Sequence, residues 1–552
     1  MCRLLWGLVL VAMSSLAHAD GVDDQTRPNI PQLMAENLSP RIEALGDPVA
    51  RPAHAAERPN IVFIMSDDHA VRAVSAYGDS LMETPNIDRI AARGMRFDRA
   101  YVGNALCGPS RATMLTGLHS HGHGFYSNDW SGPFDGNQQT LPQLLQEAGY
   151  RTAVIGKWHL NSDPVGFDHW EVIDNAFEQG TYYNPEFRSP AGVEAATGYV
   201  TGLITDRAID WLEMAASRPE PFFLIYNHKT PHRDWLPAPR ELREWDEGAT
   251  VPEPPTLLRD LSGLIRARRE ARMSIAGYMT DHDVKLSMSD NLTPEQAALW
   301  KAAFAAGNRE YAAADLSESD TVRWKYQRYI KTYLASIKSM DREIGRLLDY
   351  LEDNNLDENT IVVYTSDQGF FLGENGWFDK RWMDEVSSRV PLLVQWPAQV
   401  NAGSVNGDLV QNIDFAPTLL DAAGVEPRKP MHGVSFLPLL RGEAAAGERD
   451  LYYHFYENPG FHGVARHYGI HTGRYKLVHY YRNGEWELFD LKQDPGELDN
   501  VYGKPAYAAL ARDLKGRLKD LRARYGVPDE DPKAPWYHGP LIRLMEQLMK
   551  LR

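Results

Sequence analysis

Short apolar runs alternate with longer amphipathic segments through most of the chain. Runs rich in β-branched and aromatic residues predict strands over residues 61–65, 152–155, 222–226, 360–364 and 392–394. Apolar residues at three- and four-residue steps predict helices over residues 141–148, 206–216 and 324–351. Strands and helices in alternation predict an α/β fold with a large, mostly parallel sheet that helices cover on both faces.

The pattern changes near residue 433, where short aromatic segments replace the longer alternation. These segments predict a small antiparallel sheet with strands over residues 451–456, 467–470, 475–479 and 486–489. A helix over 506–525 would cover this sheet, and the apolar tail 541–551 predicts a final helix. We therefore expect a main domain over residues 59–433 and a C-terminal α+β subdomain over residues 434–552.

The first residues form a segment of a different kind. Arg3 precedes the apolar run 4–12, and an A-x-A site ends at Ala19. These features are typical of a cleaved secretory signal. We expect a signal peptide over 1–19, an N-terminal extension over 20–58, and export to the periplasm or the extracellular space. No later apolar run approaches the ~18 residues that span a bilayer, so we expect no stable membrane insertion.

The composition is that of an acidic globular protein. The chain has 552 residues, and 58 Lys plus Arg against 75 Asp plus Glu leave a formal net charge of −17. Hydrophobic residues make up 43% and charged residues 24%, which excludes a disordered polymer, a collagen-like repeat and a multi-span membrane protein. The negative charge argues against general binding to nucleic acid or anionic lipid. An anionic substrate is still compatible with it, because a pocket can hold positive charge locally.

Export would leave a single cysteine in the mature chain. The sequence contains two cysteines, and signal cleavage would remove Cys2. Cys107 could then form no internal disulfide, and a lone thiol in an oxidising compartment is a hazard. Either Cys107 is a small buried residue, or it does not remain a thiol.

Polar residues follow four of the predicted strands. They are Ser-Asp-Asp-His at 66–69, Gly-Lys-Trp-His at 156–159, Asn-His-Lys-Thr-Pro-His at 227–232 and Ser-Asp-Gln-Gly at 366–369. Ligands bind beyond the carboxyl ends of parallel strands, so we expect these side chains to meet at one rim of the sheet. The alternative is that each set only caps the helix that follows it.

This rim includes four hard oxygen donors, which are Asp67, Asp68, Asp367 and the amide of Gln368. Three carboxylates in one place would repel each other unless a cation lay between them. Such donors suit Ca²⁺ or Mg²⁺ rather than zinc, which prefers nitrogen and sulfur. We expect one divalent ion, with Ca²⁺ favoured over Mg²⁺.

The segment Cys107-Gly108-Pro109-Ser110-Arg111, followed by Leu115-Thr116-Gly117, resembles the active-site signature of the type I sulfatases. Further short motifs of that family occur in the same order along this chain, at 67–68, 156–159, 230–232, 367–369 and 378–381. The resemblance therefore covers residues 60–396. The resemblance implies an alkaline phosphatase-like fold and hydrolysis of sulfate esters. In the family, a separate maturation enzyme oxidises the cysteine to Cα-formylglycine, whose hydrated aldehyde is the nucleophile.

The resemblance implies six catalytic residues, which are Cys107, Arg111, Lys157, His159, His232 and Lys380. Arg111 and Lys157 would hold the hydrate, while Lys157 and Lys380 would reach the sulfate oxygens. His232 would protonate the departing sugar oxygen, with help from Lys380. His159 would take a proton from the second hydroxyl of the hydrate, which expels sulfate and restores the aldehyde.

The resemblance also adds the modified Cys107 to the metal ligands Asp67, Asp68, Asp367 and Gln368. Gln368 stands where many relatives have asparagine, a change that keeps an amide oxygen. Trp158 is interpreted as a packing residue. His69 is interpreted as a possible pocket residue, and three histidines near the matched positions are interpreted as structural: His121, His123 and His228.

Several stretches are similar to bacterial sulfatases that act on sulfated carbohydrates, of the N-acetylglucosamine-6-sulfatase and mucin-desulfating type, with ulvan sulfatases close behind. We therefore expect an exported sulfuric ester hydrolase for a sulfated carbohydrate. Two alternatives stay open. One is a phosphonate or phosphate ester hydrolase of the same superfamily, and the other is a non-catalytic protein that binds sulfated glycans.

Two further features have no assigned role. A basic run comprises Arg266, Arg268, Arg269 and Arg272. It is either a solvated helix face or a rim that attracts a polyanionic chain. In the C-terminal subdomain, Arg466 and His467 are candidate substrate contacts.

Overall fold

The computed structural model describes residues 58–174, 179–443 and 447–550, with side chains up to residue 545. The expected signal peptide and all but the last residue of the N-terminal extension lie outside the described residues. Within the described part of the chain, no helix combines the length and the apolar character needed to cross a membrane.

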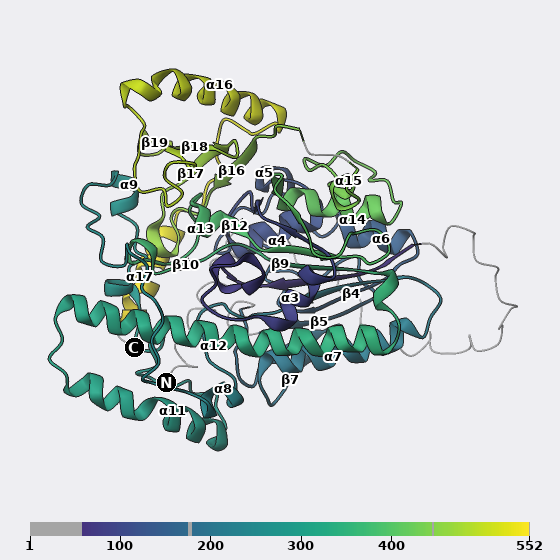
Figure 1. Ribbon diagram of the computed structural model, residues 1–552, viewed down its shortest axis with the longest axis horizontal. Coiled ribbons are helices and arrows are strands. Elements are labelled where there is room, and N and C mark those ends of the chain that lie inside the picture. Colours follow the sequence, from purple (N-terminus) through teal and green to yellow (C-terminus); the bar gives the residue numbers. More distant parts are fainter. Residues whose placement is uncertain (1–57, 175–178, 444–446, 551–552) are drawn as a thin grey trace, which may run out of the picture. The chain divides into compact units, whose positions relative to one another are not determined.

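Parallel strands form the centre of a large sheet (Figure 1). In spatial order they are β9 (Thr360–Ser366), β1 (Asn60–Ser66), β8 (Phe222–Asn227), β4 (Arg151–Gly156) and β5 (His169–Ile173). Ile61 of β1 lies opposite Ile361 on one side and Phe223 on the other. The mostly parallel sheet is therefore confirmed, and its carboxyl-terminal edge carries the polar residues that follow β1, β4, β8 and β9.

The sheet continues on both sides of this centre, mostly but not entirely through antiparallel pairs. Next to β9 lie β13 (Leu392–Gln395), β2 (Met95–Phe97) and β14 (Ser404–Asn406), and next to β5 lie β6 (Glu186–Ser189) and β7 (Gly192–Ala195). The predicted strand at 392–394 exists, but β13 runs antiparallel to β9. A parallel return needs a crossover over the sheet. The chain between these strands instead forms the ribbon β10 (Phe371–Leu372) with β11 (Phe378–Asp379) and the single turn α13 (Glu385–Ser388).

Alternate residues of β1 enter two hydrophobic cores, one on each face of the sheet. Ile61, Phe63 and Met65 belong to one core, and Val62 and Ile64 belong to the other. The first core includes residues of α4 (Cys107–Thr116), α6 (Leu141–Glu147) and α14 (Phe415–Ala422). The second includes residues of α3 (Pro85–Ala92), α7 (Val200–Ala216) and α12 (Glu318–Asp353). The continuous apolar character of β1 follows from this double burial.

A smaller antiparallel sheet forms near the C-terminus, as the aromatic segments predicted. Its strands are β16 (Leu451–Phe455), β17 (His467–His471), β18 (Tyr475–Tyr480) and β19 (Glu485–Asp490). The helix α16 (Ala508–Arg524) covers it, because Leu514 and Leu518 share a core with Ile470 and Leu477. The final helix α17 spans His538–Lys550.

Further helices and strands lie between these elements along the chain. They are β3 (Ala100–Tyr101), β12 (Arg389–Val390), β15 (Val410–Gln411), α5 (Ser120–His123), α8 (Pro239–Arg243), α9 (Arg266–Arg269), α10 (Ile275–Tyr278), α11 (Pro294–Ala313) and α15 (Leu437–Leu440).

The basic run around α9 contains residues in very different surroundings. Arg268 is buried, and its guanidinium pairs with Asp384 at 2.8 Å and with Glu487 at 2.8 Å. Arg269 beside it is exposed and donates to the Ser262 carbonyl. Arg268 therefore fits neither interpretation of the run. It ties α9 to the small sheet, because Glu487 lies in β19.

Replacing Arg268 with alanine should destabilise the fold strongly. Asp384 and Glu487 would remain buried without their cation, which typically costs about 3–5 kcal/mol. Arg269→Ala is the matched control, and a change at an exposed site of this kind should stay within about 0.5 kcal/mol. Denaturant unfolding of both variants measures the difference. Equal stability of the two variants would contradict this role for Arg268.

Candidate active site

The sheet brings the residues predicted from sequence to one place. Asp67 and Asp68 follow β1, Lys157 and His159 follow β4, and His232 lies in the loop after β8. The set is completed by Asp367 and Gln368 after β9, by Cys107 and Arg111 in α4, and by Lys380 directly after β11. Nine of these ten residues are between 0% and 3% exposed. The His232 side chain is 16% exposed.

Three carboxylates meet because β1 and β9 are neighbours in register, with Ser66 opposite Ser366. Oxygen atoms of Asp67, Asp68 and Asp367 and the sulfur of Cys107 all lie within 4.8 Å of one another. Burial, together with the neighbouring carboxylates, raises the pKa of Asp68 to about 6 and that of Asp367 to about 7. Asp67 differs, because Lys157 and other cations hold its pKa well below the usual range despite burial.

Each of the three carboxylates has its own cation. The Lys157 ammonium donates to Asp67, and the Lys380 ammonium donates to Asp68 at 2.8 Å. Arg111 donates to Asp367 from Nε at 3.0 Å and from its terminal nitrogen at 2.8 Å. A divalent ion bound among these groups would leave the cluster with a net positive charge, which suits an anionic ester.

The residues present fit such an ion. The carbonyl oxygen Oε1 of Gln368 is buried and has no hydrogen-bond partner among the described residues. Its amide nitrogen faces Asp68 and lies 3.5 Å from the Cys107 sulfur. Flipping the amide, so that its oxygen and nitrogen exchange places, would point Oε1 at the carboxylates. A hard cation bound there would coordinate Oε1 and reduce the repulsion between the carboxylates.

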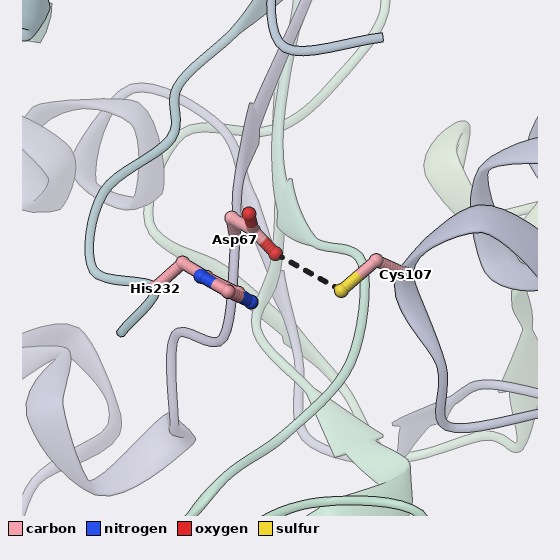
Figure 2. A group of neighbouring side chains, drawn as sticks. All are labelled: Asp67, Cys107 and His232. Carbon is pink, nitrogen blue, oxygen red and sulfur yellow. Dashed lines mark hydrogen bonds between the residues drawn. The ribbon is translucent and has the colours of Figure 1, made fainter. Parts of the chain in front are cut away.

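Cys107 stands at the first position of α4, and its thiol donates to Asp67 Oδ1 at 3.3 Å. Figure 2 shows Asp67 between Cys107 and the edge of the His232 ring. Burial and the Asp67 charge raise the pKa of the thiol well above its usual value. The site therefore disfavours a thiolate nucleophile, which would need a lowered pKa.

Two histidines flank the cluster. His232 Nδ1 lies 2.8 Å from the Arg233 carbonyl, and its Nε2 lies 3.8 Å from Asp68 Oδ2. His159 lies two residues after Lys157, beyond the end of β4, in the left-handed backbone region with φ 58°. Burial, reinforced by the Lys157 charge, lowers the pKa of both rings well below the usual value. Both are therefore neutral before an anionic substrate arrives.

Sequence reasoning missed two residues that contact this cluster. Gln179 accepts from the Lys157 ammonium at 2.7 Å and lies 2.7 Å from His159 Nε2. It follows no strand-end motif, so nothing in the sequence marked it. Asp379 accepts from the Lys380 backbone N–H at 2.7 Å and lies 2.9 Å from His462 Nε2. The sequence did contain a signal for Asp379, because this residue adjoins Lys380 in the segment 378–381 that matches the family.

Other candidate residues lie in structural positions. Arg466 donates to the Asn458 carbonyl at 2.9 Å and pairs with Asp531 at 3.1 Å. His467 is 0% exposed and stacks on Trp382. His69 bonds to the Tyr364 hydroxyl and the Ala73 carbonyl. The structure thus places Arg466 and His467 within the packing of the C-terminal region rather than in the carboxylate cluster.

Comparison with known families agrees with this geometry. A family model described as "Sulfatase" matches residues 59–425, which is more than half of the chain. The chain belongs to the sulfatase family. A second model, described as "N-sulphoglucosamine sulphohydrolase, C-terminal", matches residues 373–524 of this sulfatase. The resemblance predicted from the segment around Cys107 is therefore confirmed.

Individual relatives of this sulfatase are carbohydrate sulfatases. An N-acetylglucosamine-6-O-sulfatase of Bacteroides thetaiotaomicron is 45% identical over 89% of this chain and 91% of the relative. An ulvan-active sulfatase of Formosa agariphila is 25% identical over 87% of this chain and 84% of the relative. A structure solved in complex with its substrate D-glucosamine-2-N,6-O-disulfate is 45% identical, with a TM-score of 0.83 over 86% of this chain and 100% of that chain. This structural match also confirms the alkaline phosphatase-like fold.

Removing one carboxylate should release the divalent ion. Asp367→Asn keeps the shape of the side chain but removes a negative charge that faces the other donors, so the ion should bind more weakly. We expect a large fall in the divalent-metal content retained after dialysis, measured by mass spectrometry, together with loss of sulfate hydrolysis. Asp349→Asn, at an exposed surface pair with Arg89, is the control. Full metal content in the Asp367 variant would refute the site.

Proposed function

We propose that this sulfatase is an exported enzyme that hydrolyses the 6-O-sulfate ester of N-acetylglucosamine or a close derivative in a sulfated glycan. The observation that carries this proposal is the cluster of three carboxylates and three cations around Cys107. It occurs in a chain that is 45% identical, over most of its length, to an N-acetylglucosamine-6-O-sulfatase. An ulvan-type sulfate is the second candidate substrate, at lower identity.

The nucleophile in this proposal derives from Cys107. A maturation enzyme converts the cysteine to Cα-formylglycine, whose hydrate supplies the attacking hydroxyl. The raised pKa of the unmodified thiol supports this assignment, because the thiol itself is a poor nucleophile here. Arg111 and Lys157 border the same position and would hold the hydrate.

Asp67, Asp68, Asp367, Gln368 and the modified Cys107 would hold one Ca²⁺. When bound, the ion neutralises negative charge on the nucleophile and on the sulfate. Ca²⁺ is proposed over Mg²⁺ because it accepts a larger and less regular set of oxygen ligands. Lys157 and Lys380 would orient the sulfate oxygens from either side of the carboxylates.

The two histidines would divide the proton transfers. His232 turns Nε2 toward the cluster because Nδ1 faces the Arg233 carbonyl at 2.8 Å. A sulfate group beside it adds negative charge and raises its pKa, so that Nε2 can carry the proton needed by the departing sugar oxygen. His159 is neutral, as a base must be, and Gln179 orients its ring.

We further propose that residues 1–19 are removed on export to the periplasm or extracellular space. The catalytic domain would comprise residues 59–433 and the C-terminal subdomain residues 434–552. His462 of this subdomain contacts Asp379 beside Lys380. A phosphonate or phosphate ester hydrolase and a non-catalytic glycan binder remain the alternatives to be tested.

Co-expression with a formylglycine-generating enzyme should produce a protein that releases sulfate from N-acetylglucosamine-6-sulfate. The panel should include ulvan oligosaccharides, mucin, heparan fragments, an aryl sulfate and a phosphate monoester. Cys107→Ala should abolish turnover while retaining binding of the sulfated sugar, measured by calorimetry. Release of phosphate alone would overturn the sulfatase proposal, and full turnover by the Cys107 variant would overturn the nucleophile.

His232→Ala should discriminate between leaving groups. A sugar alkoxide needs protonation as it departs, so turnover of the sugar sulfate should fall about 10²–10⁴-fold. An aryl sulfate with an acidic phenol leaves without this help and should be affected far less. His159→Ala is the matched control, because its step follows departure of either group and both substrates should slow equally. Equal losses in the His232 variant would contradict its role as the acid.

A further inference from the structure

A small cavity lies beside Arg111 of the catalytic cluster, where residues of α4, β1 and β8 line it together with Trp158. Its volume is about 20 Å³, which is enough for one water molecule. Most of its lining is apolar, as at Phe63 and Ile225. Arg111, Trp158 and Asn227 are the lining residues with polar nitrogen or oxygen atoms in their side chains.

Two of these side chains each contain one polar atom without a partner among the described residues. The indole N–H of Trp158 and the amide oxygen Oδ1 of Asn227 are buried and have no hydrogen bond within the described part of the chain. The residues themselves are 3% and 2% exposed. Arg111 uses Nε and one terminal nitrogen for Asp367 and the other for the Lys157 carbonyl, so N–H groups remain to spare. Buried polar atoms nearly always have partners, protein or water.

We propose that one water molecule occupies this cavity, accepts from Trp158 Nε1 and donates to Asn227 Oδ1. The water fixes the orientation of the Asn227 amide. Asn227 is then a positioning residue for Lys157, because its amide nitrogen donates to the Lys157 carbonyl at 2.9 Å. Arg111 donates to the same carbonyl at 2.9 Å. This inference rests on the proposed catalytic role of Lys157.

The backbone at this point explains why Lys157 needs such support. Gly156 ends β4 in the left-handed region with φ +106°, and a Cβ there would lie 1.8 Å from the Asn227 carbonyl oxygen. The chain therefore leaves the sheet in close contact with Asn227, and the Lys157 N–H donates to the Asn227 carbonyl at 3.0 Å. Asn227 thus binds both the N–H and the carbonyl of Lys157, which fixes the backbone of the residue whose ammonium donates to Asp67.

Asn227→Asp tests the positioning role. It keeps Oδ1 for the water but turns the donor to the Lys157 carbonyl into an acceptor. On the formylglycine-loaded enzyme, kcat should fall about 10–100-fold, as for other residues that orient a catalytic group, while KM changes little. Asn60→Asp is the matched control: Asn60 starts β1 and accepts from Phe222 N–H at 3.1 Å, which aspartate can also do. An unchanged kcat in the Asn227 variant overturns the positioning role.

Trp158→Phe tests the water without adding a charge. A crystal structure at high resolution should show a water within hydrogen-bond distance of Trp158 Nε1 and Asn227 Oδ1 in the parent protein, and none in this variant. We expect kcat to fall roughly tenfold or less, since only the orientation of Asn227 is loosened. Trp300→Phe removes another buried indole N–H that has no hydrogen-bond partner among the described residues. Trp300 lies far along the chain in α11, so this variant should leave kcat unchanged.

A dry cavity in the parent crystal overturns the water site whatever the activity. If the parent enzyme releases no sulfate from any ester, the proposed function fails, and the crystallographic result still decides the water. If sulfate is released and the water is present, but both variants keep full kcat, only the positioning role fails.

Discussion

Three carboxylates buried side by side are the constraint on which the rest of this structure depends. Isolated buried charges are too costly to keep, so each must find a partner. Asp67, Asp68 and Asp367 each have one cation, and the pKa of Asp68 and of Asp367 is still raised. A divalent cation bound among them would favour the charged form of both carboxylates. The cations that surround the cluster, and the fit of the site to a divalent ion and an anionic ester, follow from these three buried carboxylates.

The fold supplies the partners from separate parts of the chain. The strand order places the ends of β9, β1, β8 and β4 in a row, so that donors and acceptors from four loops converge. Helix α4 adds Cys107 and Arg111, and the ribbon of β10 and β11 adds Lys380. The antiparallel direction of β13 relative to β9 matters for the position of Lys380. It leaves the chain free to carry Lys380 across the rim instead of crossing the sheet.

Much of the rim could be predicted because each motif follows its strand directly. Asp67, Lys157 and Asp367 stand within one or two residues of a strand end, and parallel strands end at the same edge. Gln179 could not be predicted, because its partners Lys157 and His159 lie some twenty residues away along the chain and no motif links it to them. Arg268 was misinterpreted for a related reason: a charged run looks solvated until the fold shows Asp384 and Glu487 around it.

The sequence by itself determined the strands β1, β4, β8, β9 and β13, the helices α6, α7 and α12, the small C-terminal sheet with α16, the signature around Cys107 and the order of the rim residues. These depend on short-range periodicity and on side chains adjacent to their own strand ends. Only the tertiary structure decided the direction of β13, the pairing of each carboxylate with its cation, the burial of Arg268 and the cavity behind Lys157. Each of these joins segments far apart in the chain. A pattern along the chain carries hydrophobicity and spacing, whereas the energy of a buried charge depends on what surrounds it in space.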